Sequence, residues 1–509
     1  MTEIFVEPKP ASEHHAETDE STTAGLVAAQ ERVRGLLASG EPNIVVRLAP
    51  GEYFLDRALT FAENDGSSDG RVHWVGPESG DAIINGGVAL TSWEEVEAGL
   101  FRAPLPAGVR PGTLFENGVA SPLCRYPAEG YLRTERVVEG DPRRAFGYGE
   151  HDLPELGDYE SLSVFLFPGG PTGEWNWSSF TLEAEVDPKG RTATVSREMS
   201  FDIGAGSRYY WRGAREFLDA PGQFYFDEAA GVVYYRPRRL PIEEQTVVVP
   251  LTDRILELRG SDETRPCRNI SFERLVILNC DLPKSYEGGR AEAGAVHLEN
   301  AEHIELTACR IHNTGLHGVY LTGWTQRCSI SGCEIRDVGH TGAQLDGARE
   351  RAVMTCRVNH IENNHIHHTG RNVGHGAGIQ ISFAGENVVA HNRIHHAPRY
   401  AISLKGPCPE SMVYTNIGGV HITPGNLYDY HFTRDNAITH NEMFRVNLDT
   451  QDTGVYESWG TGLGNKLTHN WIHDSDIEFS FEFGIYLDDA SSGYTVEGSL
   501  VHRLQRAGG

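Results

Sequence analysis

A recurring strand is the feature that most constrains the fold of this 509-residue chain. A short segment with a small residue near its start returns from residue 294 onward, as GAVHLE 294–299, HGVYLT 317–322, TGAQLD 341–346, AGIQIS 377–382, YAISLK 400–405, TGVYES 453–458 and FGIYLD 483–488. Successive copies are separated by 23, 24, 36, 23, 53 and 30 residues. A basal repeat of about 23 residues with insertions is typical of a solenoid whose insertions become loops on one face.

Alternation along the repeated strand predicts which side chains face the interior. The third residue of each copy is apolar and is expected to point inward, and the next residue is expected to point outward. The predicted outward set is His297, Tyr320, Gln344, Gln380, Ser403, Tyr456 and Tyr486. Glu457 alone breaks the following inward column, so either a bulge turns it outward or it is buried, where a carboxyl has a raised pKa.

An asparagine column supports the same repeat. The segments NHIENN, NVVAHN, NAITHN and NKLTHN end at Asn364, Asn392, Asn441 and Asn470, and an x-Ile-His unit follows three of them. Asparagine tolerates the left-handed backbone of a sharp turn, and stacked amides hydrogen-bond from rung to rung. Three short strands per turn, an asparagine turn and a glycine-led strand predict an all-β fold, a right-handed parallel β-helix.

The rest of the chain divides into three predicted regions. Residues 1–91 would form an N-terminal cap and the first rungs, with an amphipathic helix at 22–40 that shields the open end. Residues 92–245 lack the repeat and carry hairpin signals, which predicts an inserted β-rich domain. Residues 246–509 would form the main β-helix.

The charge balance excludes several partner classes. Lys and Arg total 44 and Asp and Glu total 71, a net charge of −27, which argues against binding of nucleic acid or anionic membranes and is compatible with a neutral glycan. The start of the chain has no secretory signal and no segment is apolar enough to span a membrane. The chain as given is expected in the cytoplasm, or in a secreted or periplasmic location if a signal was removed. The oligomeric state stays open.

The sequence resembles family 141 glycoside hydrolases and their right-handed β-helix relatives. The resemblance extends over essentially the whole chain and includes VVRLAPGEYFLDRALTF near the start, REFLDAPGQFYFDEAAGVVYYRP in the insert, DTGVYESWG at 452–460 and GIYLDDASSGYTVEG at 484–498. It implies a β-helix with an inserted β domain and activities that include α-L-fucosidase and xylanase. It leaves the sugar and the linkage open.

Glycoside hydrolysis needs two carboxyl groups that flank the scissile bond. By resemblance, Asp452 and Asp488 fall in the two acidic motifs and form the first candidate pair. The strand alignment places them six positions apart, up to about 20 Å, unless the turn that carries Asp452 folds over the strand. Glu457 is the alternative partner for Asp488. Each of the three could instead be a turn or network residue, and Glu482 is a weaker candidate.

Other outward residues would line the groove and bind the sugar. This predicted set is His340, Asp346, Gln380, Lys405, Tyr456, Trp459 and Tyr486. The histidine column His312, His367, His395, His473 and His502 is interpreted as structural, so no metal or other cofactor is expected. The leading hypothesis is a hydrolase of a polysaccharide or oligosaccharide, and the alternatives are a polysaccharide lyase, a uronate epimerase and a non-catalytic glycan-binding protein.

Overall fold

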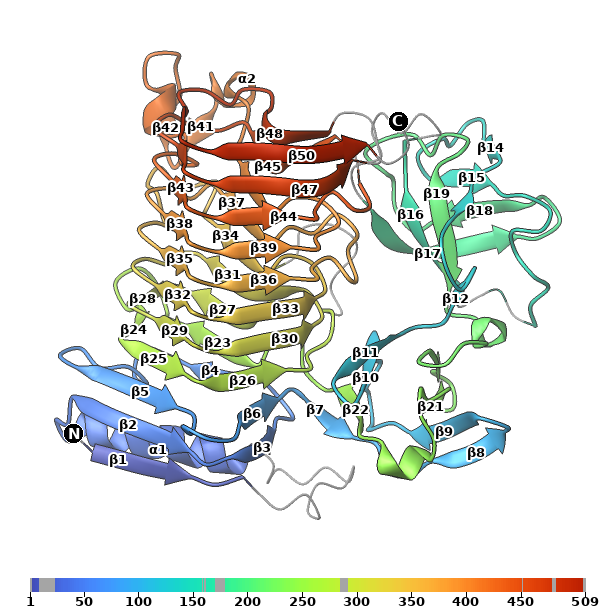
Figure 1. The fold of residues 1–509 in the computed structure, drawn as a ribbon, viewed down its shortest axis with the longest axis horizontal. Coiled ribbons are helices and arrows are strands. Elements are labelled where there is room, and N and C mark those ends of the chain that lie inside the picture. The colour runs from blue at the N-terminus through green and yellow to red at the C-terminus, as the bar shows by residue number, and fades with distance from the viewer. Residues whose placement is uncertain are drawn as a thin grey trace.

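A computed structural model describes residues 2–8, 23–157, 159, 162–169, 179–283, 292–450, 452–477 and 482–506. Its main body is a column of stacked parallel strands, with a separate β-rich part beside it (Figure 1). The strands of the column form three long parallel sheets, named I, II and III here. The predicted right-handed parallel β-helix is therefore confirmed.

The three sheets take one strand each from successive turns of the chain. Sheet I has the order β1 (Thr2–Val6), β2 (Asn43–Leu48), β5 (Arg71–Val75), β25 (Ile270–Glu273), β29 (Glu305–Thr307), β32 (Ser329–Ser331), β35 (His360–Glu362), β38 (Val388–Ala390), β43 (Ala437–Thr439), β46 (Lys466–Thr468) and β49 (Thr495–Glu497). Sheet II has the order β3 (Gly51–Phe54), β6 (Ala82–Asn85), β26 (Leu275–Leu278), β30 (Arg310–Thr314), β33 (Glu334–Val338), β36 (His365–His367), β39 (Arg393–His395), β44 (Glu442–Phe444), β47 (Trp471–Ile477) and β50 (Leu500–Arg506). Sheet III has the order β4 (Leu59–Phe61), β23 (Leu256–Arg259), β27 (Gly294–Glu299), β31 (His317–Thr322), β34 (Ala343–Asp346), β37 (Ile379–Ser382), β40 (Ile402–Lys405), β45 (Thr453–Trp459) and β48 (Glu482–Leu487).

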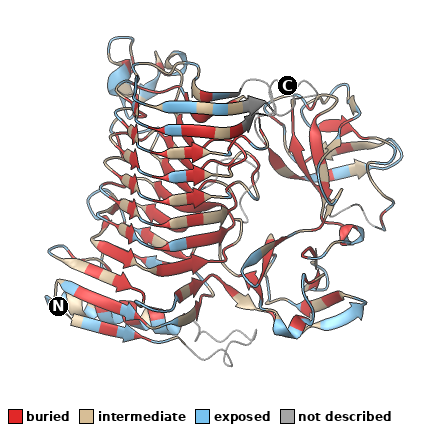
Figure 2. Cartoon of the chain, viewed as in Figure 1, coloured by how far each residue is buried: buried red, intermediate tan, exposed pale blue. Residues whose placement is uncertain are grey.

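The core follows from the strand register. In sheet II, Ile335, Ile366 and Ile394 pair in sequence from rung to rung and are fully buried. Buried residues run the length of the column in Figure 2. Full burial of one such side chain contributes about 1.5–3 kcal/mol, and the repeat supplies this contribution on every rung. All eight cysteines are unpaired, and seven of them are buried, in keeping with their role as small apolar side chains.

The asparagine column forms a continuous ladder of buried amides. The Oδ1 atom of Asn441 accepts hydrogen bonds from the backbone N–H and the Nδ2 of Asn392, and Asn441 donates in the same way to Asn470. The left-handed residue of each turn is the one before the ladder position, such as His440 with φ 55°. The asparagines themselves therefore serve the ladder, and the expected turn role belongs to their neighbours. A second ladder connects Asn359, Asn387, Asn436 and Asn465.

Helix α1 (Ala24–Ala38) lies at the N-terminal end of the column (Figure 1). Its buried residues include Leu26, Ala29 and Val33, which pack into the same core as the sheets. The predicted capping helix is thus confirmed. Strand β1 precedes the helix and forms the edge of sheet I, where it pairs in parallel with β2.

The β-rich part lies between β6 and β23 in the sequence. One sheet has the order β11 (Val119–Pro122), β10 (Thr113–Glu116), β22 (Val247–Pro250) and β7 (Gly87–Ala89), and another has β20 (Phe224–Asp227), β21 (Val232–Tyr235), β9 (Leu100–Pro104) and β8 (Glu94–Glu97). The largest has the order β12 (Arg125–Tyr126), β19 (Arg208–Arg212), β16 (Ser163–Phe167), β17 (Phe180–Asp187), β18 (Thr192–Val195), β15 (Ala145–Gly147) and β14 (Arg136–Val137), with β13 (Leu132–Arg133) paired to β19. These sheets have hydrophobic cores separate from that of the column. The boundaries at 92 and 245 stay a prediction.

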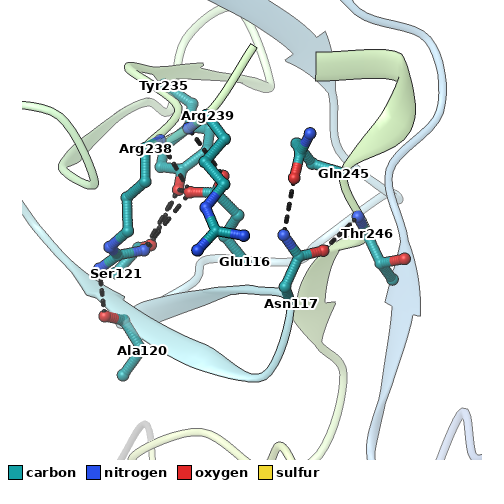
Figure 3. A network of polar contacts seen from close by, with 9 residues as sticks. All are labelled: Glu116, Asn117, Ala120, Ser121, Tyr235, Arg238, Arg239, Gln245 and Thr246. Atoms are coloured by element: carbon teal, nitrogen blue, oxygen red, sulfur yellow. Dashed lines mark hydrogen bonds and ion pairs between the residues drawn. The ribbon is translucent and has the colours of Figure 1, made fainter. Parts of the chain in front are cut away.

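A buried carboxylate joins the sheets of this part (Figure 3). Glu116 is 2% exposed and accepts hydrogen bonds from the Tyr235 hydroxyl at 2.5 Å and from the backbone N–H of Arg238 at 2.9 Å. Arg238 also donates to Ser121 at 2.6 Å. The network holds the segment after β21 against β10 and β11.

We expect Glu116→Ala to lower the free energy of unfolding of the β-rich part by about 3–5 kcal/mol, because Arg238 and Tyr235 lose their buried partner. Thermal unfolding followed by tryptophan fluorescence measures the loss. Glu94→Ala, at an exposed carboxylate paired with Arg102, is the control and should cost less than about 1 kcal/mol. Equal losses in the two variants would contradict the importance of the buried network.

Candidate active site

The register of β45 differs from the alignment expected from sequence. Tyr456 pairs with Ile402 on one side and Ile485 on the other, so it belongs to the inward column. Its side chain is fully buried and its hydroxyl donates to Tyr494 in the interior. The prediction that Tyr456 lines the groove is therefore wrong. The offset between β45 and β48 is constant and differs by one residue from the alignment that matches Gly454 with Gly484, and this shift gives Tyr456 and Glu457 the positions expected for Val455 and Tyr456.

The same shift places Glu457 in the outward column. It pairs with Ser403 below and Tyr486 above, which are both outward residues of sheet III. Its carboxylate accepts a hydrogen bond from the Ser403 hydroxyl at 2.8 Å and forms an ion pair with Lys405. Glu457 is only 1% exposed, so it lies beneath the surface of the outer face. Two orientations were expected for Glu457, outward or buried in the inward column. The outward orientation is the one observed, and the register of β45 produces it.

Asp452 reaches the same face from the turn before β45. Its backbone is left-handed, with φ 53°, and its carbonyl accepts a hydrogen bond from Arg399 at 2.8 Å. The Tyr486 hydroxyl donates to the Asp452 carboxylate at 3.4 Å. The turn therefore folds back over the strand, which removes the separation of about 20 Å that a straight strand would impose.

Asp488 approaches the same tyrosine from the end of β48. The backbone N–H of Asp488 donates to Ser458, so Asp488 continues the rung beyond Leu487. The pKa of Tyr486 is raised by burial and by the negative charges of Asp452 and Asp488, both of which also interact with its hydroxyl. Two carboxylate oxygens within hydrogen-bond reach of one phenolic oxygen lie no more than about 7 Å apart.

The acidic residues have two cationic neighbours. The ring of Tyr400 lies between the two cations, with the Arg399 guanidinium 4.5 Å and the Lys405 ammonium 4.9 Å from its centroid. Burial raises the pKa of Asp452, the charge of Arg399 opposes this, and the charges of Asp488 and Glu457 reinforce it. Burial lowers the pKa of Lys405, against the attraction of Glu457. The site thus combines a carboxyl that retains its proton more strongly than usual with an ammonium that loses its proton more easily.

The raised pKa of Asp452 gives a stability prediction. The folded state binds the Asp452 proton more tightly than the unfolded state, so this contribution to stability is complete below the unfolded pKa of about 3.9 and is lost as the pH rises through the folded value. Asp452→Asn removes the ionisation and should raise the melting temperature near neutral pH, with the difference disappearing in acid. Thermal unfolding at both pH values checks this.

Asp489→Asn, at the exposed neighbour of Asp488, is the control and should leave the melting temperature unchanged at either pH. A lower melting temperature for Asp452→Asn near neutral pH would contradict the predicted sign.

The other predicted groove residues are distributed along the column. Trp459 pairs with Lys405 and is 37% exposed, so it borders the cluster. Gln380 pairs with Ser403, two rungs from Glu457, and Asp346 lies two rungs from Lys405 through Ser382. The ring of His340 instead packs between His317 and His375, at 5.0 and 5.2 Å. The Glu482 side chain lies outside the described residues.

Sequence reasoning missed two residues of the cluster, Arg399 and Tyr400. Arg399 lies just before the repeated segment YAISLK 400–405, and Tyr400 opens it, at a position whose residue type varies from copy to copy and so gives no periodic signal. No sequence pattern indicated that the β-rich part contacts the loop before Asp452. Arg208 forms an ion pair with Asp449 at 2.7 Å, and the Tyr131 hydroxyl donates to the same carboxylate at 2.5 Å. The β-rich part therefore anchors the loop that leads to the site.

Comparison with known proteins supports the architecture. The family described as "Right handed beta helix region" matches residues 264–373 and 294–501. No curated protein matches the sequence. A solved structure described as "Glycoside hydrolase" superposes with a TM-score of 0.78 at 18% identity, and the match covers 98% of this chain and 96% of the other. At that identity the similarity establishes the fold.

Two further structures share less of the geometry. A structure of XylC with xylose has a TM-score of 0.43 at 11% identity, and the match covers 86% of this chain and 62% of that one. Pectate lyase Pel9A has a TM-score of 0.32 at 7% identity, with coverage of 99% and 79%. Among the described residues, no helix has the length and apolar character needed to cross a membrane.

Proposed function

We propose that the chain is a glycoside hydrolase whose active site is the cluster of Asp452, Asp488 and Tyr486 at the upper end of sheet III. The observation that carries the proposal is that both carboxylates approach the hydroxyl of Tyr486. A separation of no more than about 7 Å is compatible with paired carboxyls that act on the two sides of a glycosidic bond.

The surroundings favour different roles for the two carboxyls. Because burial raises the pKa of Asp452, we assign it as the general acid that protonates the leaving oxygen. The Oδ1 of Asp488 accepts the backbone N–H of Asp489 at 2.7 Å, a contact that orients this carboxyl at the end of β48. We assign Asp488 as the nucleophile or as the base that activates water.

Glu457 has a supporting role in this proposal. It is buried, it accepts a hydrogen bond from Ser403, and it is paired with Lys405. A carboxylate held in this way keeps the Lys405 ammonium at the edge of the cluster, where it can donate to a sugar hydroxyl. The exposed face of Trp459 on the same rung suits the apolar face of a sugar ring.

The comparisons and the sequence resemblance are in keeping with this assignment. The structure that superposes over nearly the whole chain is described as a glycoside hydrolase, and the residues that resemble family 141 include both acidic motifs. The family assignment, the substrate class and the hydrolytic reaction remain parts of the proposal. The substrate we infer is a neutral oligosaccharide or polysaccharide, because the chain carries a net charge of −27.

A lyase or epimerase is the second candidate, and Lys405 is the observation that favours it. Its pKa is lowered by burial, and a neutral amine beside a sugar could remove the proton next to a uronate carboxyl. Arg399 could then neutralise the uronate carboxylate. This reaction would not need the pairing of Asp452 with Asp488.

One screen separates these functions. The purified chain is incubated with aryl fucosides, arabinosides and xylosides and with neutral and uronate polysaccharides, and both reducing ends and the absorbance of unsaturated uronates are followed. The hydrolase proposal predicts new reducing ends without the absorbance. Unsaturated product would support the lyase, and glycan binding with neither signal would overturn both the hydrolase and the lyase.

A further inference from the structure

The sequence unit Ile-His-His occurs on two neighbouring rungs, at 366–368 and 394–396. Strands β36 and β39 pair in register, so His367 lies directly opposite His395. The second histidine of each unit, His368 or His396, is the left-handed residue that ends the strand, with φ 54° and 55°. The sequence pattern indicated one histidine per rung, and the turn brings a second one beside it.

The imidazoles of this histidine cluster contact one another through nitrogen atoms. The Nδ1 atoms of His367 and His368 lie 2.6 Å apart, and those of His395 and His396 lie 2.5 Å apart. From rung to rung, the rings of His367 and His395 are 4.9 Å apart and those of His368 and His396 are 4.6 Å apart. The two pairs therefore form one compact group of four imidazoles.

A fifth imidazole joins the group. The Nε2 of His365 lies 2.8 Å from the Nε2 of His395. One nitrogen each from His367, His368 and His395 can be chosen so that all three atoms lie within 4.8 Å of one another. Three imidazole nitrogens in such proximity match the ligand set of many zinc sites that keep a fourth position for water.

The environment keeps these rings in the form that binds metal. Burial, followed by the charges of neighbouring imidazoles, lowers the pKa of His395 to about 3, and burial and His365 lower that of His367 to about 4. The rings are therefore neutral at physiological pH, with one lone pair each. The Nε2 of His367 faces the Glu334 carboxylate at 3.5 Å, the kind of partner that orients a metal-binding imidazole.

We propose that His367, His368 and His395 bind one divalent transition-metal ion, for which Zn²⁺ is the best match, with His396 and His365 as adjoining ligands. The imidazole donors suit a borderline ion and not Ca²⁺ or Mg²⁺, which prefer oxygen. His368 is exposed and His395 is partly exposed, so an ion can enter from solvent. The site lies on sheet II, where the ion would join two neighbouring rungs. The proposed active site lies on sheet III, so this inference does not depend on the proposed function.

Equilibrium dialysis of untagged protein with Zn²⁺ tests the proposal. The wild-type chain should bind one equivalent, and His368→Ala combined with His396→Ala should weaken the affinity at least ten-fold. His440→Ala is the matched control, because it removes a histidine from a different stack of imidazoles on the column. In that stack the ring of His440 lies 4.9 Å from the ring of His391 and 5.0 Å from the ring of His469. This control should bind Zn²⁺ as tightly as the wild type.

Substitution with Co²⁺ gives a second readout on the unaltered protein. A four-coordinate imidazole site should produce visible absorption bands that Zn²⁺ displaces at one equivalent. Absence of these bands together with no Zn²⁺ binding by the wild type would overturn the proposal. It would also be overturned if His440→Ala weakened binding as much as the double variant.

Discussion

Asp452→Asn and Asp488→Asn are each expected to lower kcat/KM by about 10²- to 10⁴-fold on a glycoside whose leaving group needs protonation. Each substitution removes a proton donor or an anionic charge and preserves the size of the side chain. In Asp452→Asn, the oxygen of the new amide can still accept the Tyr486 hydrogen bond, so the geometry of the cluster is retained. Initial rates of reducing-end release from an unactivated oligosaccharide measure the effect.

The two variants should also differ from each other. With an activated aryl leaving group that needs no protonation, Asp452→Asn should lose less activity than Asp488→Asn, because only the general acid becomes dispensable. Asp489→Asn is the matched control, since this carboxyl is exposed and adjacent, and it should retain wild-type rates. Full activity in both Asp452→Asn and Asp488→Asn would remove the proposed pair.

Asn441→Ala is expected to cost about 3–5 kcal/mol of stability in the upper half of the column, because several buried hydrogen bonds lose a partner together. Asn392 would lose its acceptor for two donors at 3.0 Å, and the Val389 carbonyl would lose its donor at 2.9 Å. Since a solenoid opens rung by rung, the local measure is hydrogen exchange at the Asn392 backbone amide, which should accelerate by several orders of magnitude.

An exposed asparagine provides the comparison for this variant. Asn363 has φ 57° and is exposed, and it lies immediately before a ladder position. Asn363→Ala should cost only about 1 kcal/mol, the strain of a left-handed alanine. Equal effects of Asn441→Ala and Asn363→Ala would show that the amide ladder contributes no special stability.

Much of the fold could be predicted from the sequence because a solenoid repeats the same physical requirement on each rung. Inward positions such as Val319 and Ile379 must be apolar at fixed spacing, and they are fully buried. The asparagine ladder leaves a similar periodic signal. The helix that caps the column was also predictable, since its apolar face has no other partner.

The site was less predictable because it depends on departures from the repeat. The register of β45 lies one residue from the alignment that matches its glycine with those of the other copies, so Tyr456 points inward and Glu457 outward, opposite to the expected alternation. The contact of Tyr486 with Asp452 depends on a left-handed turn, and that conformation is not encoded by spacing. Arg399 approaches from a turn of another rung for the same reason. The histidine cluster was underestimated because its second members also lie in turns.

Hydrolysis in water enriched in the heavy oxygen isotope tests the central claim most directly. The wild-type chain is incubated with the best substrate from the screen, and the products are analysed by mass spectrometry. The hydrolase account predicts that each cleavage places one heavy oxygen atom at the new reducing end and that Asp488→Asn forms little labelled product. Cleavage that yields unlabelled, unsaturated products would contradict it.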